Sequence, residues 1–224
     1  MIRLLTVLPA LVVAAMLCGA FPASAQTPRQ VTWEDLMPPD TPLPDPFAHL
    51  SMDIVVKLHG IIGIREQKRM GQLSEVSPEY EQSLEFEHDL KRMGVDVERL
   101  IREYWEMDRE IERRNRLVVP ELDGQFVRIP GYALPLEAVG LAIEEFLLVP
   151  YVGACIHVPP PPPNQMVLVK LKEPFVATDL FAPVWITGRV TVKTTTKSVF
   201  ITDGTAPVES GYIVENAQVE PYRE

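Results

Sequence analysis

The spacing of hydrophobic residues changes near residue 120, from the period of a helix to the period of a strand. The hydrophobic residues at helical spacing in the first region are Phe47, Leu50, Ile54, Leu58 and Ile61. Such spacing places them on one face of a helix. Ser77-Pro78 marks a second helix start, because serine caps a helix N-terminus and proline suits its first turn. Asp96 can cap a third helix. We therefore predict a helical section over residues 47–119.

The third predicted helix bears charges of both signs between Glu98 and Arg114. Mixed charges at helical spacing are typical of a solvated helix face. The alternative is a helical arm that docks a partner. Both interpretations need a long amphipathic helix, so the sequence leaves both open.

From Glu121 onward, hydrophobic and polar residues alternate, which is typical of strands. The candidate strands are Phe126–Ile129, Phe146–Val149, Ala154–Val158, Met166–Leu171, Val184–Lys193 and Tyr212–Val219. Gly188 interrupts the longest of them, as glycine does where a sheet bends. We predict an α+β protein whose helical N-terminal section is followed, over residues 120–224, by a small antiparallel β-barrel. The expected type is OB-like (oligonucleotide/oligosaccharide-binding), with a β-sandwich fragment as the alternative.

Residues 1–25 have the order of a secretory signal peptide. Arg3 gives a positive start, an almost wholly apolar stretch follows, and Ala23-Ser24-Ala25 supplies small residues for cleavage before Gln26. We therefore expect an exported, periplasmic protein with no stable membrane span after cleavage.

Residues 26–46 form a proline-rich lead-in between the signal peptide and the helical section. Its prolines at 38, 39, 42, 44 and 46 favour extended chain without internal hydrogen bonds. Trp33 and Leu36 are large enough to anchor this segment on a domain surface. We predict a strap that lies against the protein.

Composition and charge exclude several classes of protein. The 224-residue chain has a formal net charge of −10, whereas nucleic-acid binding needs a basic face, so we expect no nucleic-acid partner. Its 22 prolines argue against one uninterrupted helical bundle. Of its two cysteines, Cys18 leaves with the signal peptide. Cys155 then remains alone, which excludes a disulfide scaffold.

Cys155 and His157 are the candidate functional residues. At positions i and i+2 of a predicted strand, their side chains share a face at a spacing of about 6–7 Å. Both can then bind one metal ion, and zinc is the candidate cofactor. Zinc needs at least one more ligand. The other histidines of the mature chain, His49, His59 and His88, all fall in the helical section.

Two other interpretations of Cys155 stay open. In the first, Cys155 is a nucleophile activated by His157. In the second, Cys155 is a small buried hydrophobic residue, and His157 forms a hydrogen bond with the neighbouring backbone. The sequence contains no nucleophile elbow, phosphate-binding glycine loop or dinucleotide fingerprint. We therefore name no catalytic residue and favour a protein that is not an enzyme.

Several segments resemble the DUF3299 family of bacterial exported proteins. They are Trp33–Leu36, Val127–Glu137, Glu145–Tyr151, Gly153–Gln165 and Pro183–Gly188, the fourth of which combines Cys-x-His with five consecutive prolines and Asn164-Gln165. The family has no agreed activity, but its members often occur beside ABC-type permeases, some in zinc-responsive gene sets. The resemblance implies a binding or accessory protein of an envelope transport system, with a role in transition-metal homeostasis. The alternatives are an enzyme that uses Cys155 with His157, and a purely structural envelope protein.

Overall fold

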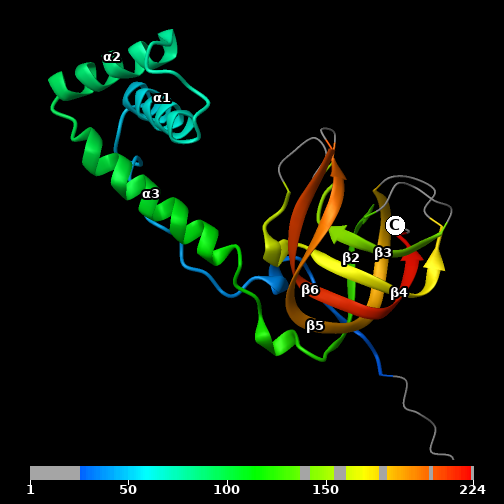
Figure 1. Cartoon of the computed structure of the whole chain (residues 1–224). Coiled ribbons are helices and arrows are strands. Elements are labelled where there is room, and N and C mark those ends of the chain that lie inside the picture. The colour runs from blue at the N-terminus through cyan, green and yellow to red at the C-terminus, as the bar shows by residue number, and fades with distance from the viewer. Residues whose placement is uncertain (1–25, 137–141, 154–159, 177–180, 202–203, 223–224) are drawn as a thin grey trace, which may run out of the picture.

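The computed structural model describes residues 26–136, 142–153, 160–176, 181–201 and 204–222. The helices are α1 (Met52–Arg69), α2 (Pro78–Arg92) and α3 (Val97–Arg114), with short 3-10 helices η1 (Glu34–Leu36), η2 (Pro120–Leu122) and η3 (Pro163–Gln165). The strands are β1 (Arg29–Gln30), β2 (Phe126–Pro135), β3 (Ile143–Val149), β4 (Val167–Phe175), β5 (Ala182–Ile201) and β6 (Gly204–Pro221). The helices stand apart from the sheet (Figure 1). We call residues 47–105 the helical head.

The helix starts in the head lie where the sequence predicts them. Ser77 precedes α2, and its hydroxyl accepts a hydrogen bond from the Tyr80 N–H at 3.2 Å. Asp96 precedes α3, and its carboxylate accepts one from the Arg99 N–H at 3.1 Å. Both caps satisfy N–H groups that have no partner within the helix. Between the two helices Gly94 has a φ of 76°, a left-handed conformation that suits glycine at a helix end.

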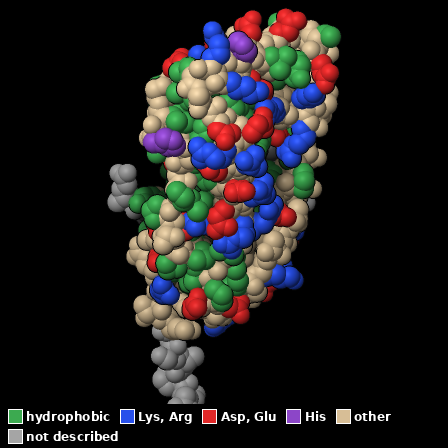
Figure 2. All heavy atoms as spheres, turned by 90° about the vertical axis from the view of Figure 1, so that its left-hand side faces the viewer, with side chains coloured by type: hydrophobic (Ala, Val, Ile, Leu, Met, Phe, Trp, Pro, Cys, Tyr) green, Lys and Arg blue, Asp and Glu red, His purple; other side chains and the backbone are tan. Residues whose placement is uncertain are grey.

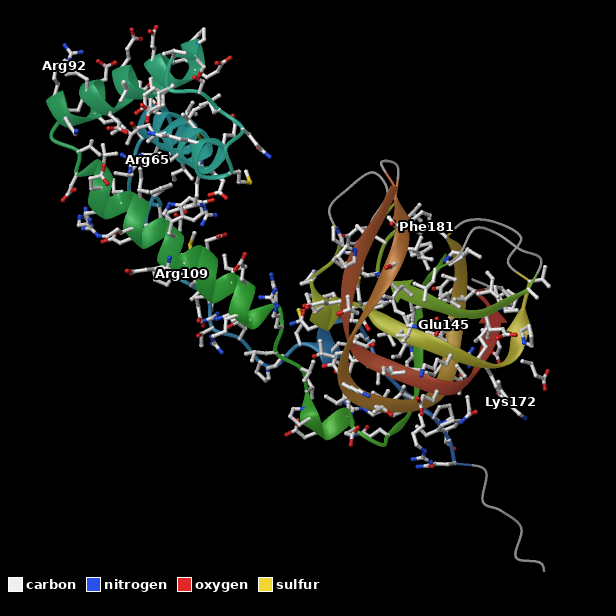
Figure 3. The ribbon with its side chains drawn as sticks, in the orientation of Figure 1. Arg65, Arg92, Arg109, Glu145, Lys172 and Phe181 are labelled. Atoms are coloured by element: carbon white, nitrogen blue, oxygen red, sulfur yellow. The ribbon has the colours of Figure 1, made fainter. Side chains whose placement is uncertain are left out.

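The helical head has a hydrophobic core of its own. Its buried members are Phe47, Leu58, Ile61, Ile62, Leu90, Val97, Leu100 and Ile101. Arg65 of α1 joins the three helices at the edge of this core (Figure 3). Its guanidinium donates to Glu87 of α2 at 2.8 Å and to Glu98 of α3 at 2.6 Å. The ion pairs of Arg65 therefore add to the contacts of the small hydrophobic core in holding the three helices together.

The chain reaches the head along residues 33–46, which begin with η1 and continue as extended chain, and which we call the strap. The strap leaves the sheet after η1 and runs beside α3 to the start of α1 (Figure 1). Two anchors hold its beginning, as the sequence predicts: Leu36 is fully buried in the sheet core, and Trp33 packs against that core. A hollow of about 320 Å³ between its prolines and α3 is lined by Leu43, Pro44 and Met107, among others.

The strands form one sheet in the order β1-β2-β3-β4-β6-β5. β2 pairs with β5 as well as with β3, so the pairings return to β2. β5 and β6 form a long hairpin whose ladder extends from Val184 opposite Pro221 to Ile201 opposite Gly204. The strand segments expected from alternation are found, except Ala154–Val158, which lies outside the described residues.

The prediction of a helical N-terminal section followed by a small antiparallel OB-like barrel is wrong. The sheet is mixed, because β1 pairs with β2 and β4 pairs with β6 in parallel. Helical structure is also not confined to the N-terminal section, since η2 and η3 lie within residues 120–224. Alternation has the same period of two in parallel and antiparallel strands. Strand direction therefore depends on which segments meet, and the pattern does not reveal that.

β3 is buried on both of its faces. Phe146 and Leu148 belong to one hydrophobic cluster, and Leu147 and Val149 belong to a second. The second cluster includes Val199 of β5 and Val208 of β6, so the far half of that hairpin covers the second face. Burial on both faces explains the uninterrupted apolar run in this strand, which departs from simple alternation.

Gly188 allows β5 and β6 to approach closely. A Cβ atom at this position would lie 2.5 Å from a methyl group of Val214, and the β5–β6 register shifts between Thr187 and Arg189. The glycine expected at a bend therefore lies at an irregularity of the ladder. None of the described helices combines the length and the apolar composition that a membrane crossing requires.

Candidate functional site

The strap, the end of α3, η3 and β6 meet at one place, which we call the junction. Tyr212 of β6 lies at its centre, fully buried. Its hydroxyl donates to the Leu36 carbonyl at 2.6 Å and accepts from the Val119 N–H at 2.7 Å. Burial raises the pKa of Tyr212, against a smaller lowering by the Val119 hydrogen bond, so the phenol keeps its proton. One side chain thus joins three distant segments.

η3 connects the proline run to the end of α3. The prolines have no N–H group, so the first donor after the run is the Asn164 N–H, which bonds to the Asn115 carbonyl at 3.1 Å. The Asn164 side-chain Nδ2 donates to the Arg114 carbonyl at 3.0 Å. Gln165 Nε2 donates to the Trp33 carbonyl at 2.7 Å. The end of the sequence motif therefore bonds to both α3 and the beginning of the strap.

Arg114 fastens the strap to α3 from the other side of the junction. Its guanidinium bonds to the Asp40 carboxylate and donates to the Thr41 carbonyl at 2.6 Å. It also pairs with Glu110 one turn earlier, at 2.8 Å. The hydrogen bonds to Glu110 and Asp40 raise the pKa of Arg114, in keeping with a permanently charged group.

A hollow of about 780 Å³ opens at the junction between the strap and the end of α3. Its lining includes the charged residues Arg29, Glu34 and Asp35, together with the apolar Met37 and Leu117. Asn164 also lines it, with 3% of its surface exposed. The Asn164 Oδ1 atom has no hydrogen-bond partner among the described residues.

The junction holds distant segments together and forms a hollow that is open to solvent. Among the described residues that line the hollow there is neither histidine nor cysteine. In the part of the chain that the structure describes, no three His, Cys, Asp or Glu side chains form a group that could hold a metal ion. The hollow offers hydrogen-bond donors, acceptors and a mixed charged rim.

Cys155 and His157 lie in residues 154–159, outside the described residues. The three other histidines, His49, His59 and His88, all lie in the helical section, as the sequence indicates. His59 packs edge-on against Phe47 and Tyr104 at 5.5 and 5.9 Å, whereas His88 is exposed on α2. Among the described residues, the sheet therefore contributes no histidine that could join Cys155 and His157.

The sequence analysis missed Tyr212 and Arg114 as organising residues. Tyr212 opens a candidate strand, but nothing in the alternation shows that its hydroxyl reaches Leu36. Arg114 is one charge among many on α3, and its contact with Asp40 depends on where the strap runs. The one available signal was Asn164-Gln165, a pair of amides directly after the proline run.

Comparisons with known proteins identify related chains. Residues 33–221 match the model of a family described as "Protein of unknown function (DUF3299)". A similar solved structure is the crystal structure of a DUF3299 family protein (PA4066) from Pseudomonas aeruginosa PAO1 at 2.45 Å resolution. It is 28% identical, and the match covers 89% of this chain and 99% of that chain with a TM-score of 0.46. No protein with a curated description matches.

Proposed function

The chain belongs to the DUF3299 family, and we propose that it is an exported, non-enzymatic accessory protein of an ABC-type envelope transport system. In this proposal the helical head binds the transport component, and the sheet and junction present the head in a fixed position. The observation that supports it is the build of the head, which has a separate core and projects from the sheet (Figure 1).

The surface of the head favours a docking role. Three large apolar side chains at or near its helices are strongly exposed: Met52 at 76%, Val56 at 58% and Val76 at 85%. Met52 and Val56 lie one turn apart on α1, so they share a face. Exposed apolar groups that cluster on one element are typical of interaction sites.

The connection between head and sheet favours a fixed presentation. α3 has 18 residues and so extends about 27 Å, at ~1.5 Å per residue. The strap runs beside it, fastened by Arg114, and Tyr212 holds the base of both segments. A docking element held rigidly loses less conformational entropy on binding than a flexible one.

Photo-crosslinking in cells tests this function. A photoreactive residue replaces Val56 on the head, and the control carries it at Lys172, which is exposed on the sheet. We expect Val56 to crosslink to a permease of the inner membrane and Lys172 to give little product.

Release of a chain beginning at Gln26 by osmotic shock is expected for a periplasmic protein. Equal crosslinking from both positions, or a chain retained in the cytoplasm with residues 1–25 attached, would reject the proposal.

Cys155 and His157 are the proposed link to transition-metal homeostasis. On the strand predicted for residues 154–158 their spacing suits two ligands of a zinc ion, whose further ligands would be carboxylates because the described histidines lie in the helical section. Stoichiometric zinc in the purified mature protein, lost in both Cys155→Ser and His157→Ala, is the expected result. Absence of bound metal, with a melting temperature that chelation does not change, would remove the metal from the proposal.

Alkylation of Cys155 under native conditions separates this function from the enzymatic alternative. An activated thiolate reacts quickly, with a rate that follows its low pKa. We expect protection of Cys155 until unfolding, or protection by zinc that ends on chelation. Rapid, pH-dependent alkylation of the metal-free native protein would favour an enzyme that uses Cys155 with His157.

A further inference from the structure

Five arginines form a row along α3 and its C-terminal turn. They are Arg99, Arg102, Arg109, Arg113 and Arg116, and all five are exposed. At 3.6 residues per turn they fall within a sector of roughly 100° of the helix circumference. Glu106 interrupts the row. Figure 2 shows Lys and Arg side chains along the middle of one face of the molecule, with Asp and Glu side chains among them. We call these five residues the arginine ridge.

The ridge lies away from the packed side of α3. Leu100 and Ile101 are buried in the head core, and Met107 contributes to the hollow beside the strap. The sector that contains the ridge is opposite the buried residues on the helix. Contacts with other elements therefore do not account for the positions of Arg99, Arg102, Arg109 and Arg113, whereas Arg116 pairs with Glu209 of β6.

The ridge is weakly neutralised within the chain. Arg99 pairs with Glu103 at 2.8 Å and Arg113 with Glu110 at 2.7 Å, both between exposed or partly exposed groups of the same helix. Arg116 pairs with Glu209 of β6 at 3.5 Å, again between exposed side chains. The salt bridges among the described residues do not include Arg102 or Arg109, the second of which is labelled on α3 in Figure 3. Exposed pairs contribute little stability, so a partner can replace them.

The positive row is unexpected in so acidic a chain. The formal net charge is −10. Glu98 and Glu106 lie within the sector of the row, whereas Glu103 and Glu110 border it on one side and Glu112 on the other. A broad anionic surface such as a membrane would meet the bordering acids together with the arginines. A single helix would meet the five arginines with Glu98 and Glu106 but not the bordering acids, over the row's length of about 25 Å from Arg99 to Arg116 at ~1.5 Å per residue.

We propose that the arginine ridge docks an acidic helix of a partner protein. The partner helix has aspartate or glutamate at every third or fourth position on one face, the spacing that complements the ridge. Arginine suits this contact, because its guanidinium binds carboxylates through two parallel hydrogen bonds. The partner's identity as a transport component rests on the proposed function, whereas the chemistry of the contact does not.

A synthetic helix tests the proposal with the full mature chain, residues 26–224. The probe is an alanine-rich peptide of about 21 residues, long enough to span the ridge, with glutamates in one helical stripe. A peptide of the same composition with scattered glutamates is its control. We expect the striped peptide to bind at least tenfold more tightly, and more weakly as salt rises from about 50 to 300 mM, because salt screens exposed charges.

Two pairs of variants locate the contact. Arg102→Glu with Arg109→Glu should weaken binding of the striped peptide at least tenfold, and Arg102→Gln with Arg109→Gln should weaken it less. The matched control, Lys172→Glu with Lys193→Glu, makes the same charge change at exposed positions of the sheet and should change affinity less than twofold. All four positions are exposed, so the helical circular dichroism signal and melting temperature should stay unchanged.

Three results would overturn the proposal that the arginine ridge docks an acidic helix. They are equal binding of the two peptides, unchanged affinity in both Arg102/Arg109 variants, and stronger binding to phosphatidylglycerol vesicles than to the striped peptide. Failure of the ridge and failure of the proposed function are distinguishable. If Val56 crosslinks to a permease but the striped peptide does not bind, only the docking of an acidic helix on the ridge is rejected. Peptide binding without any such crosslinks rejects the proposed function alone.

Discussion

The buried cluster of the helical head comes from helices that follow one another in sequence. The junction, in contrast, joins residues as far apart as Leu36 and Tyr212, which are separated by 176 positions. The head has eight buried hydrophobic residues among the described ones, and the two clusters of the sheet have 18 and 10. The head depends on local contacts and on Arg65 to complete a small core. The sheet depends on long-range contacts and a large core. The comparison suggests a stable platform that presents a less stable docking element.

The largest effect is expected from Phe146→Ala in the sheet core. Phe146 is fully buried, and truncation of a buried phenylalanine costs about 3–5 kcal/mol in the free energy of unfolding. If the two cores are separate, hydrogen exchange should accelerate in β3, β4 and β6 while α1 and α2 keep their protection. Hydrogen-exchange mass spectrometry resolves these segments.

Leu58→Ala is the matched change in the head, where Leu58 is also fully buried. It should cost about 2–5 kcal/mol locally and accelerate exchange in α1 and α2 only. Equal loss of protection across the chain in both variants would show that head and sheet unfold as one unit.

Tyr212→Phe is expected to give the next largest effect. It leaves the buried Leu36 carbonyl and Val119 N–H without their partner, at a cost of about 1–3 kcal/mol. Exchange should increase at Val119 and along the strap, more than in the head core. The control is Tyr222→Phe, whose side chain is 44% exposed, with an expected change of less than ~0.5 kcal/mol. Similar melting temperatures for both variants would contradict the role of Tyr212.

Arg65→Met should destabilise the head by about 1–2 kcal/mol, a value reduced for the partial exposure of its ion pairs. Hydrogen bonds to Glu98 and Glu87 raise the pKa of Arg65, against a smaller effect of burial. The control is Arg92→Met, which removes an exposed pair with Asp89 within α2 and should have little effect. Chemical denaturation followed by Trp105 fluorescence measures the difference. An equal effect of both variants would show that Arg65 does not join the helices.

The smallest effect concerns Glu110, at the base of α3. Hydrogen bonds from Arg113 and Arg114 lower its pKa from 4.5 to about 2. Because the folded-state pKa is lowered, these bonds stabilise the fold above pH 4.5 and are lost as the pH falls through about 2. An NMR titration of the Glu110 carboxyl should show this low midpoint, and Arg113→Gln should raise it. The same midpoint in both proteins would contradict the assignment.

The elements of the head were predictable because their signals are local. Ser77 and Asp96 cap their helices through bonds to residues three positions away, and Gly94 ends α2 through its own conformation. The strand positions were predictable for the same reason, since alternation reports which residues face a core. The burial of β3 on both faces was not, because it depends on the β5–β6 hairpin that covers it.

The candidate site was predictable only in part. Trp33 and Leu36 were expected as anchors, and Asn164 and Gln165 lie at the junction in a motif that the sequence singles out. Cys155 and His157 stay a prediction. The docking interpretation of the mixed charges on α3 stays a prediction. The helical turn brings Arg99, Arg102, Arg109 and Arg113 into one sector, together with Glu106, which the linear sequence conceals.

By itself, the sequence determined the family, the helix and strand positions and the anchors of the lead-in, because each depends on short-range spacing or on a motif. The tertiary structure decided strand direction, the meeting of strap, α3, η3 and β6 at Tyr212, and the separation of head from sheet. These features depend on contacts between segments distant in sequence. Such contacts form only when the whole chain minimises exposed apolar surface and unpaired backbone groups together.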